Sequence, residues 1–271
     1  MRDGRIVSET MKYLLFDSLV QGSGKFDFSG KQPKVVLKGK ASTLKLQNLA
    51  KELWKKENLE GFANGDFKLI FFLGDALTFK STLQGFVQLY GEDVTLKGYD
   101  FDKLAAVFDP SQKSSKGINL SSLAFGALNV LNGGNTLFKQ INTKVEMGYS
   151  ELRFSDVAYS TPLHRAALKG SFQLIEDSLK DVSIALLDEK GCASVEQKLS
   201  GSLSHPSLKL DNQTLNTLSH VVFSFSSKKK KEALQSASTQ NTDEEACNVF
   251  YEGVVKHPDP MAVTHPNPNG E

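Results

Sequence analysis

Cysteine, tryptophan and histidine are scarce in this chain. Its 271 residues include two cysteines, one tryptophan and five histidines. Two cysteines cannot supply a four-thiolate zinc site or the disulfide framework of a small secreted scaffold. The histidines are spread along the chain, and three of the five precede proline, a context that favours extended loops. We therefore expect no metal site and no cofactor.

The chain also lacks a surplus of one charge and any long apolar run. Its 32 basic and 31 acidic residues leave a net charge of +1, too little to neutralise a phosphate backbone, so nucleic acid is not an expected partner. No window approaches the ~18 to 20 apolar residues of a membrane-spanning helix. The apolar run from Met11 to Phe16 is too short for a signal-peptide core.

Catalytic motifs are missing as well. Gly22 to Lys25 reads GSGK, but a phosphate-binding loop needs glycine and serine or threonine where Leu19 and Phe26 stand. No Gly-x-Ser-x-Gly elbow occurs. The carboxylates of Asp188 and Glu189 lie in a polar, turn-like stretch where nothing raises a pKa toward acid catalysis. We expect no catalytic residue and no enzyme.

Alternation of apolar and polar residues is the dominant positive signal, and it is typical of strands with one buried face. Arg165 to Leu174 and Val195 to Leu203 carry it most clearly. Weaker examples are Lys25 to Phe28, Lys34 to Ala41, Gly85 to Tyr90, Val94 to Lys97, Leu152 to Phe154, Val182 to Leu186 and Leu208 to Leu210. Turn residues separate these runs without regular alternation with helices, which predicts a mainly β, largely antiparallel fold of about ten strands.

Other segments depart from this alternation. Phe67 to Leu73 is apolar on both sides, so we expect a central strand covered on both faces. Leu46 to Glu60 has one apolar stripe that includes Leu53 and Trp54, and Asp100 can cap a short helix through Phe108. Leu120 to Leu131 is a third expected helix, whereas the residues after Asp211 fit a helix or a strand equally well.

Composition divides the chain into five parts. We expect an N-terminal lead-in at residues 1–23, a β-rich domain at 24–225 and a low-complexity disordered loop at 226–246. Apolar residues return at 247–256, and a disordered, proline-rich tail occupies 257–271. Lys228 to Lys231 could touch anionic lipid, but a solvated loop is the more common role of such a run.

Cys192 and Cys247 have two interpretations. They are free thiols in a reducing compartment, or a single bridge in an oxidising one. A bridge closing this 55-residue span would stabilise the fold by roughly 4 kcal/mol through loop entropy. It would also hold the returning segment against the sheet.

The order of segments resembles the C-terminal region of the AsmA family of bacterial envelope proteins, over roughly Gly24 to Val255. The similar pieces are FANGDFKLIFFLGD, the stretch LQGFVQLYGEDVTLKGYDFDKL at Leu83 to Leu104, a Thr-x-Phe segment at Thr136 to Phe138, and GSLSHPSLKLD at Gly201 to Asp211. Phe101 stands where the family usually has leucine.

The resemblance implies an elongated, bent antiparallel sheet that forms a groove, with a few short amphipathic helices. It implies a periplasmic protein of outer-membrane biogenesis that binds or conducts phospholipid, tied to the inner membrane by an anchor missing from this chain. On this basis Cys192 and Cys247 should be bridged, and the groove-lining side chains are expected to be Phe71, Val87, Leu89, Leu168, Phe172, Leu199 and Leu203.

Two other classes of function stay open. The chain could be an assembly factor that contacts outer-membrane assembly proteins through a sheet edge and carries no lipid. An enzyme is the third class. A groove filled by Leu53, Trp54, Phe101 and Phe108 would indicate a packed core, whereas an open apolar trough would indicate lipid.

Overall fold

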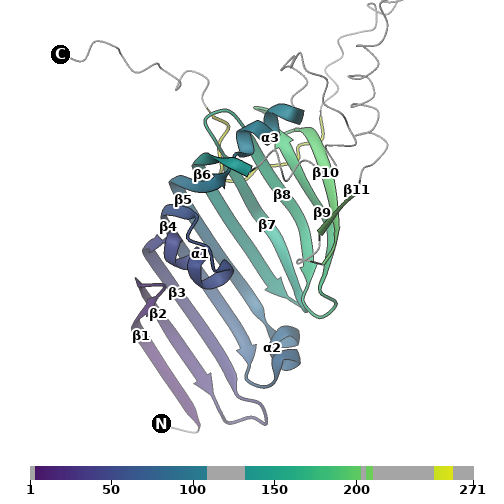
Figure 1. The fold of residues 1–271 in the computed structure, drawn as a ribbon. Coiled ribbons are helices and arrows are strands. Elements are labelled where there is room, and N and C mark those ends of the chain that lie inside the picture. The colour runs from purple at the N-terminus through teal and green to yellow at the C-terminus, as the bar shows by residue number, and fades with distance from the viewer. Residues whose placement is uncertain (1–3, 109–131, 203–205, 210–246, 259–271) are drawn as a thin grey trace, which may run out of the picture.

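The protein is built on one long antiparallel sheet. The computed structural model describes residues 4–108, 132–202, 206–209 and 247–258. Its strands follow one another across the sheet in chain order, and β1 and β11 form the edges of this open sheet (Figure 1). The strands are β1 (Arg5–Leu15), β2 (Ser18–Asp27), β3 (Lys34–Lys45), β4 (Leu59–Phe72), β5 (Gln84–Tyr99), β6 (Asn132–Gly148), β7 (Glu151–Ser160), β8 (Arg165–Gln173), β9 (Ser178–Leu187), β10 (Ala193–Gly201) and β11 (Pro206–Lys209). The prediction of a mainly β, antiparallel fold is confirmed.

Tight turns explain why consecutive strands pair. Phe16 and Asp17 connect β1 to β2 with φ of 53° and 58°, and Tyr149 and Ser150 connect β6 to β7 with φ of 53° and 63°. Two successive residues with positive φ are typical of the two-residue turns whose twist matches antiparallel strands. Each such hairpin places the next strand beside the previous one, which gives the meander.

Three short helices lie at the ends of strands: α1 (Leu46–Trp54), α2 (Ala76–Thr82) and α3 (Phe101–Phe108). Asp75 caps α2 by accepting a hydrogen bond from Thr78 N at 2.8 Å, and Asp100 caps α3 by accepting one from Lys103 N at 3.0 Å. α1 ends where Lys55 adopts the left-handed conformation. In Figure 1 the helices lie near the ends of the strands.

The two faces of the sheet differ in chemistry. We call the face that carries Val87 and Leu89 the apolar face, and the face that carries Gln88 and Lys68 the polar face; successive residues of a strand alternate between them. Most side chains of the apolar face are buried or half-buried, whereas charged side chains of the polar face are largely exposed.

Buried side chains form two clusters. The first joins α1 to strand residues at one end of the apolar face: Val20, Ala41, Leu44, Leu46, Leu49, Ala63, Val94 and Phe138. The second lies on the polar face of β7 to β9, where Ala158, Ala167, Ala185 and Leu187 pack against Phe250, Tyr251 and Val255. The core is therefore divided between the two sides of the sheet.

Several sequence expectations need correction. Residues 5–23 are no lead-in, because β1 and most of β2 lie there and pair with the rest of the sheet. Gly85 to Tyr90 and Val94 to Lys97 belong to the single strand β5. Phe67 to Phe72 is half-buried throughout, so it is not a strand covered on both faces. The expected elements at 120–131 and 211–225, the loop at 226–246 and the tail from 259 onward lie outside the described residues.

The helix expected at Leu46 to Glu60 is shorter than predicted. Only Leu46, Leu49 and Ala50 of its apolar stripe are buried. Leu53 and Trp54 are 58% and 59% exposed, because α1 stops after Trp54 and β4 begins at Leu59. These two side chains therefore do not fill the space over the sheet.

Candidate functional site

The strand register places the predicted groove residues on one face. Residues directly opposite each other in an antiparallel pair point to the same side. Leu89 is opposite Thr143, which is opposite Val157, which is opposite Leu168. The same reasoning along the other strands assigns to the apolar face Phe71, Val87, Leu89, Leu168, Phe172 and Leu199, while Leu203 lies outside the described residues.

Helices cover the apolar face near the ends of strands. At one end the buried side chains of α1 pack on the sheet, and the ring of Phe101 from α3 lies 5.6 Å from Tyr159 and 5.9 Å from Phe138. At the other end of β4, Phe79 of α2 packs edge-on against Phe71 at 5.2 Å. The face is therefore bounded by helices, and Phe71 lies under one of them.

Between these helices the apolar side chains are only partly covered. Among the described residues, α1 contacts β3 and β4, α2 contacts β4 and α3 contacts β6. The side chains left half-buried include Leu37, Leu69, Val87, Val145, Phe154, Leu168 and Ile184. A row of half-buried apolar side chains that crosses seven strands is a surface that favours a further apolar cover.

A glycine of β3 makes room for an aromatic ring on the apolar face. Gly39 lies opposite Phe67, and a Cβ at Gly39 would meet the Phe67 ring at 2.6 Å and the Tyr13 hydroxyl at 2.9 Å. The Phe67 ring can lie over the backbone of β3 only because residue 39 has no side chain. The Phe67 ring therefore lies against the backbone of β3 on the apolar face.

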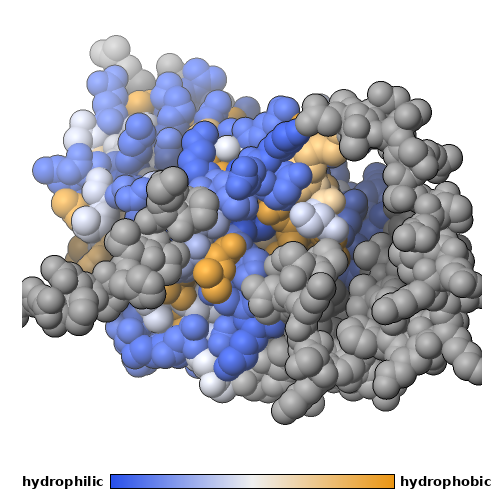
Figure 2. All heavy atoms as spheres, turned by 90° about the horizontal axis from the view of Figure 1, so that it is seen from above, coloured by the Kyte–Doolittle hydropathy of each residue, from blue (hydrophilic) through white to orange (hydrophobic). Residues whose placement is uncertain are grey.

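Figure 2 views the molecule from the end at which α3 lies. Hydrophilic residues dominate this surface, with hydrophobic residues gathered toward its middle. One shallow pocket is lined by Trp54, Lys56, Asn58, Leu59 and Leu96. The exposed Trp54 thus borders a depression beside α1.

The C-terminal segment Cys247 to Pro258, which we call the strap, packs on the polar face. A disulfide joins Cys192 to Cys247, with the Cα atoms 6.1 Å apart. Phe250 N and Tyr251 N both donate to Gly191 O, at 2.9 and 3.0 Å. The strap therefore covers the face opposite the predicted groove residues.

Buried polar groups fasten the strap to β7 and β8. Arg165 is 7% exposed, and its guanidinium donates to Val255 O at 3.3 Å and Asp188 O at 2.7 Å. Burial lowers the pKa of Arg165. The Tyr251 hydroxyl donates to Asp156 Oδ1 at 2.6 Å, and burial together with this bond raises the pKa of Tyr251. These hydrogen bonds offset much of the cost of burying the two groups, while Arg165 Nε is buried without a hydrogen-bond partner among the described residues.

Sequence reasoning missed the place where the strap docks. The alternation of Arg165 to Leu174 places Arg165 on the polar side of its strand, whereas the structure buries its side chain. The sequence feature that could have indicated this site is a set of three small residues, Ala158, Ala167 and Ala185. The strand register places them side by side on the polar face. Small side chains in the middle of a polar face leave room for a covering segment.

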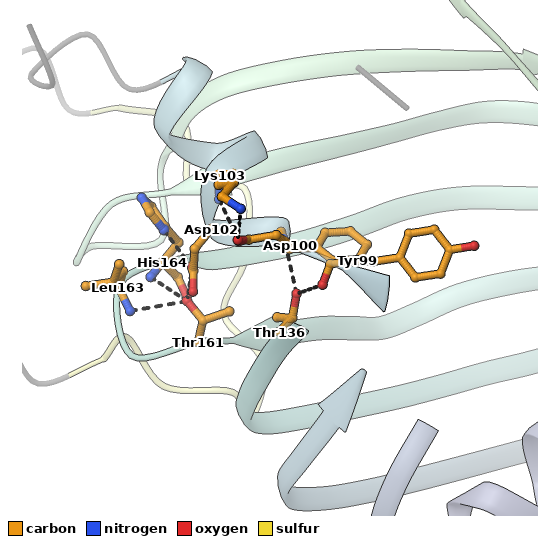
Figure 3. A network of polar contacts seen from close by, with 9 residues as sticks. Tyr99, Asp100, Asp102, Lys103, Thr136, Thr161, Leu163 and His164 are labelled. Atoms are coloured by element: carbon orange, nitrogen blue, oxygen red, sulfur yellow. Dashed lines mark hydrogen bonds and ion pairs between the residues drawn. The ribbon is translucent and has the colours of Figure 1, made fainter. Parts of the chain in front are cut away.

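A second polar network docks α3 (Figure 3). Asp102 Oδ1 accepts a hydrogen bond from Thr161 Oγ1 at 2.5 Å and lies 2.9 Å from His164 Nδ1. Thr136 Oγ1 accepts from Phe101 N and donates to Tyr99 O, both at 2.9 Å. The Thr161 hydroxyl bonds to Asp102 and to the backbone of His164, not to the histidine ring, so the cluster lacks the nucleophile–base contact of a catalytic triad. It fixes the start of α3 over the end of the sheet.

Replacing the α3 cap is expected to cost about 1 kcal/mol of unfolding free energy. The hydrogen bond from Lys103 N and the nearby Lys103 ammonium hold the pKa of Asp100 below its ordinary value of 3.8. The stabilisation by the Asp100 cap is therefore complete at pH values above 3.8, and it is lost as the pH falls through the lowered pKa of Asp100. Urea unfolding of the native protein and Asp100→Ala over an acidic pH series measures the loss.

Asp100→Asn is the matched control, because asparagine keeps the capping acceptor and removes the titration. Its unfolding free energy should stay close to that of the native protein at neutral pH. Equal stability of the alanine and native proteins at neutral pH would contradict the capping role.

No protein-family model, curated protein or solved structure matches this chain. Within the described ranges, no helix is long and apolar enough to cross a membrane. A search of the same ranges finds no group of three or more histidine, cysteine or acidic residues that could hold a metal ion. The site therefore has to be interpreted from its own geometry.

Proposed function

We propose that this protein is a non-enzymatic, AsmA-like protein of outer-membrane biogenesis that binds or conducts phospholipid acyl chains along its apolar face. The single observation that carries the proposal is the continuous row of half-buried apolar side chains across the open sheet. The strap leaves this row uncovered, because it packs on the opposite face. The resemblance to the AsmA family agrees with this interpretation.

The transfer free energy of an acyl chain favours its binding over the half-buried side chains of the apolar face. Each methylene transferred from water to an apolar surface contributes about 0.8 kcal/mol, so an acyl chain of ordinary length gains enough to bind. The charged head group stays in water, since burying it unpaired costs far more. An open sheet allows both at once.

Periplasmic location is part of the proposal. The Cys192–Cys247 disulfide supports it, because disulfides persist in oxidising compartments and are rare in the cytosol. The anchorage to the inner membrane stays an expectation from the resemblance.

Lipid content tests the proposal. The protein is purified after export to a bacterial periplasm, weighed by native mass spectrometry, and extracted for lipid analysis. We expect bound phospholipid and saturable binding of a fluorescent fatty acid. Lipid-free protein that also fails to bind the fluorescent fatty acid would contradict the proposal.

A second candidate is the assembly factor, and the edge strand β1 favours it. β1 is eleven residues long, and its outer edge pairs with no strand of the described residues. Such an edge can receive a strand from another protein. Lipid-free protein that binds an extended peptide along β1 is the outcome that would select this candidate.

An enzyme has less support from the geometry. Asp188 accepts from Cys192 N and, through its carbonyl, from Arg165, and His164 contacts Asp102. The side chains of His164 and Asp188 thus have structural partners. His205 lies outside the described residues, and the exposed Glu189 uses its carbonyl as another acceptor for Arg165.

A further inference from the structure

The polar face of β1 to β4 carries an excess of positive charge. Register and alternation place on it Lys12, Lys25, Lys34, Lys38, Lys40, Lys45 and Lys68, together with Arg5. The carboxylates there are Asp27, Glu60 and Asp66, with Glu9 in the bulge of β1. Eight basic groups against four acidic ones leave an excess of four, in a chain whose net charge is only +1.

These lysines are exposed and poorly compensated. All of them are exposed except Lys68, which is half-buried. Among the described residues, the ion pairs on this part of the face join Arg5 to Asp27 at 2.9 Å and Glu60 to Lys97 of β5 at 2.5 Å. Lys38 and Lys68 are directly opposite each other in the β3–β4 pair, an arrangement of like charges that destabilises a sheet. A bound anionic surface would relieve this repulsion.

Exposed aliphatic side chains lie on the same face, at the β1 margin. Val7 is opposite Lys25, and Leu14 is opposite Leu19. Their exposed fractions are 56% for Val7, 73% for Leu14 and 48% for Leu19. Basic groups beside exposed aliphatic ones are typical of proteins that lie on a membrane surface, where lysines meet anionic head groups and aliphatic chains enter the interface.

We propose that the polar face of β1 to β4 docks on an anionic bilayer surface. A nucleic acid would neutralise the lysines but would leave Val7, Leu14 and Leu19 in water, so it fits the face less well. The docking site lies on the opposite side of the sheet from the apolar face and does not depend on the proposed lipid binding. It would hold the protein beside the bilayer with the apolar face turned away from it.

Flotation with vesicles tests the docking site. The purified protein is mixed with phosphatidylcholine vesicles or with vesicles in which about a third of the lipid is phosphatidylglycerol. We expect binding to the anionic vesicles that weakens steeply with added salt, and little binding to the neutral ones. Equal binding to both vesicles would overturn the proposal.

Substitutions locate the site on the sheet. Lys38→Gln with Lys68→Gln should lower the vesicle partition coefficient roughly 30-fold, about fivefold for each lysine removed near the surface. Lys180→Gln with Lys198→Gln removes the same charge from exposed positions of the polar face at β9 and β10, and it should change binding little. Equal losses in the two double variants would indicate a non-specific charge effect and overturn the assignment to β1 to β4.

Two further measurements distinguish membrane docking from acyl-chain binding and from binding of other polyanions. Val87→Asp, on the apolar face, should lose acyl-chain binding and keep vesicle binding, so the two proposals can fail independently. Binding to duplex DNA or to an acidic polypeptide without binding to anionic vesicles would overturn the membrane assignment.

Discussion

A carboxylate at Val87 is expected to lower acyl-chain binding by at least about 100-fold, which corresponds to roughly 3 kcal/mol. Val87 lies on the apolar face between Phe67 of β4 and Val145 of β6. A bound acyl chain would have to cover the new charge and strip its water. Titration with a fluorescent fatty acid measures the loss, and circular dichroism with thermal unfolding checks that Val87→Asp still folds.

Neighbouring positions on β10 give a matched control for the same prediction. Leu199 is half-buried on the apolar face, and Lys198 is exposed on the polar face. Leu199→Asp should weaken acyl-chain binding, whereas Lys198→Asp should bind like the native protein. Native-like lipid content in both Val87→Asp and Leu199→Asp would show that the apolar face is not the binding surface.

Loss of the Cys192–Cys247 disulfide is expected to lower the unfolding free energy by roughly 4 kcal/mol, because the bridge closes a 55-residue span. It should also release the strap, which few backbone hydrogen bonds hold to the sheet. Urea unfolding with and without reductant measures the first effect. Hydrogen exchange at Phe250, Tyr251 and Val255 measures the second.

The single and double cysteine variants form the control. Cys192→Ala, Cys247→Ala and the double variant should lose similar stability, since each removes the same bond. Mass mapping of the exported native protein should find the two cysteines in one bridge. Two free thiols after export, or a double variant about as stable as the oxidised protein, would contradict this prediction.

The amino-acid sequence was sufficient for the strands and for the face that most of them bury. Alternation is a local property, so Val195 to Leu203 and Arg165 to Leu174 predicted one-sided strands without knowledge of their neighbours. The capping aspartate at Asp100 predicted α3 for the same reason. Because the chain has only two cysteines, an internal bridge can join only Cys192 and Cys247.

The boundaries of elements and the cover of each face depended on the tertiary structure. β1 was expected as a lead-in because its alternation is broken by the bulge between Ser8 and Met11, and only pairing with β2 makes it a strand. The stripe of α1 predicted burial of Trp54, but a side chain is buried only when another element lies over it. Alternation predicts that the polar side of β8 faces solvent. In the structure the strap, more than eighty residues away in the chain, covers Ala167 and Arg165 there. Contacts between segments so far apart in the chain are not encoded in the alternation of one strand, so only the folded protein shows that the strap covers part of the polar face.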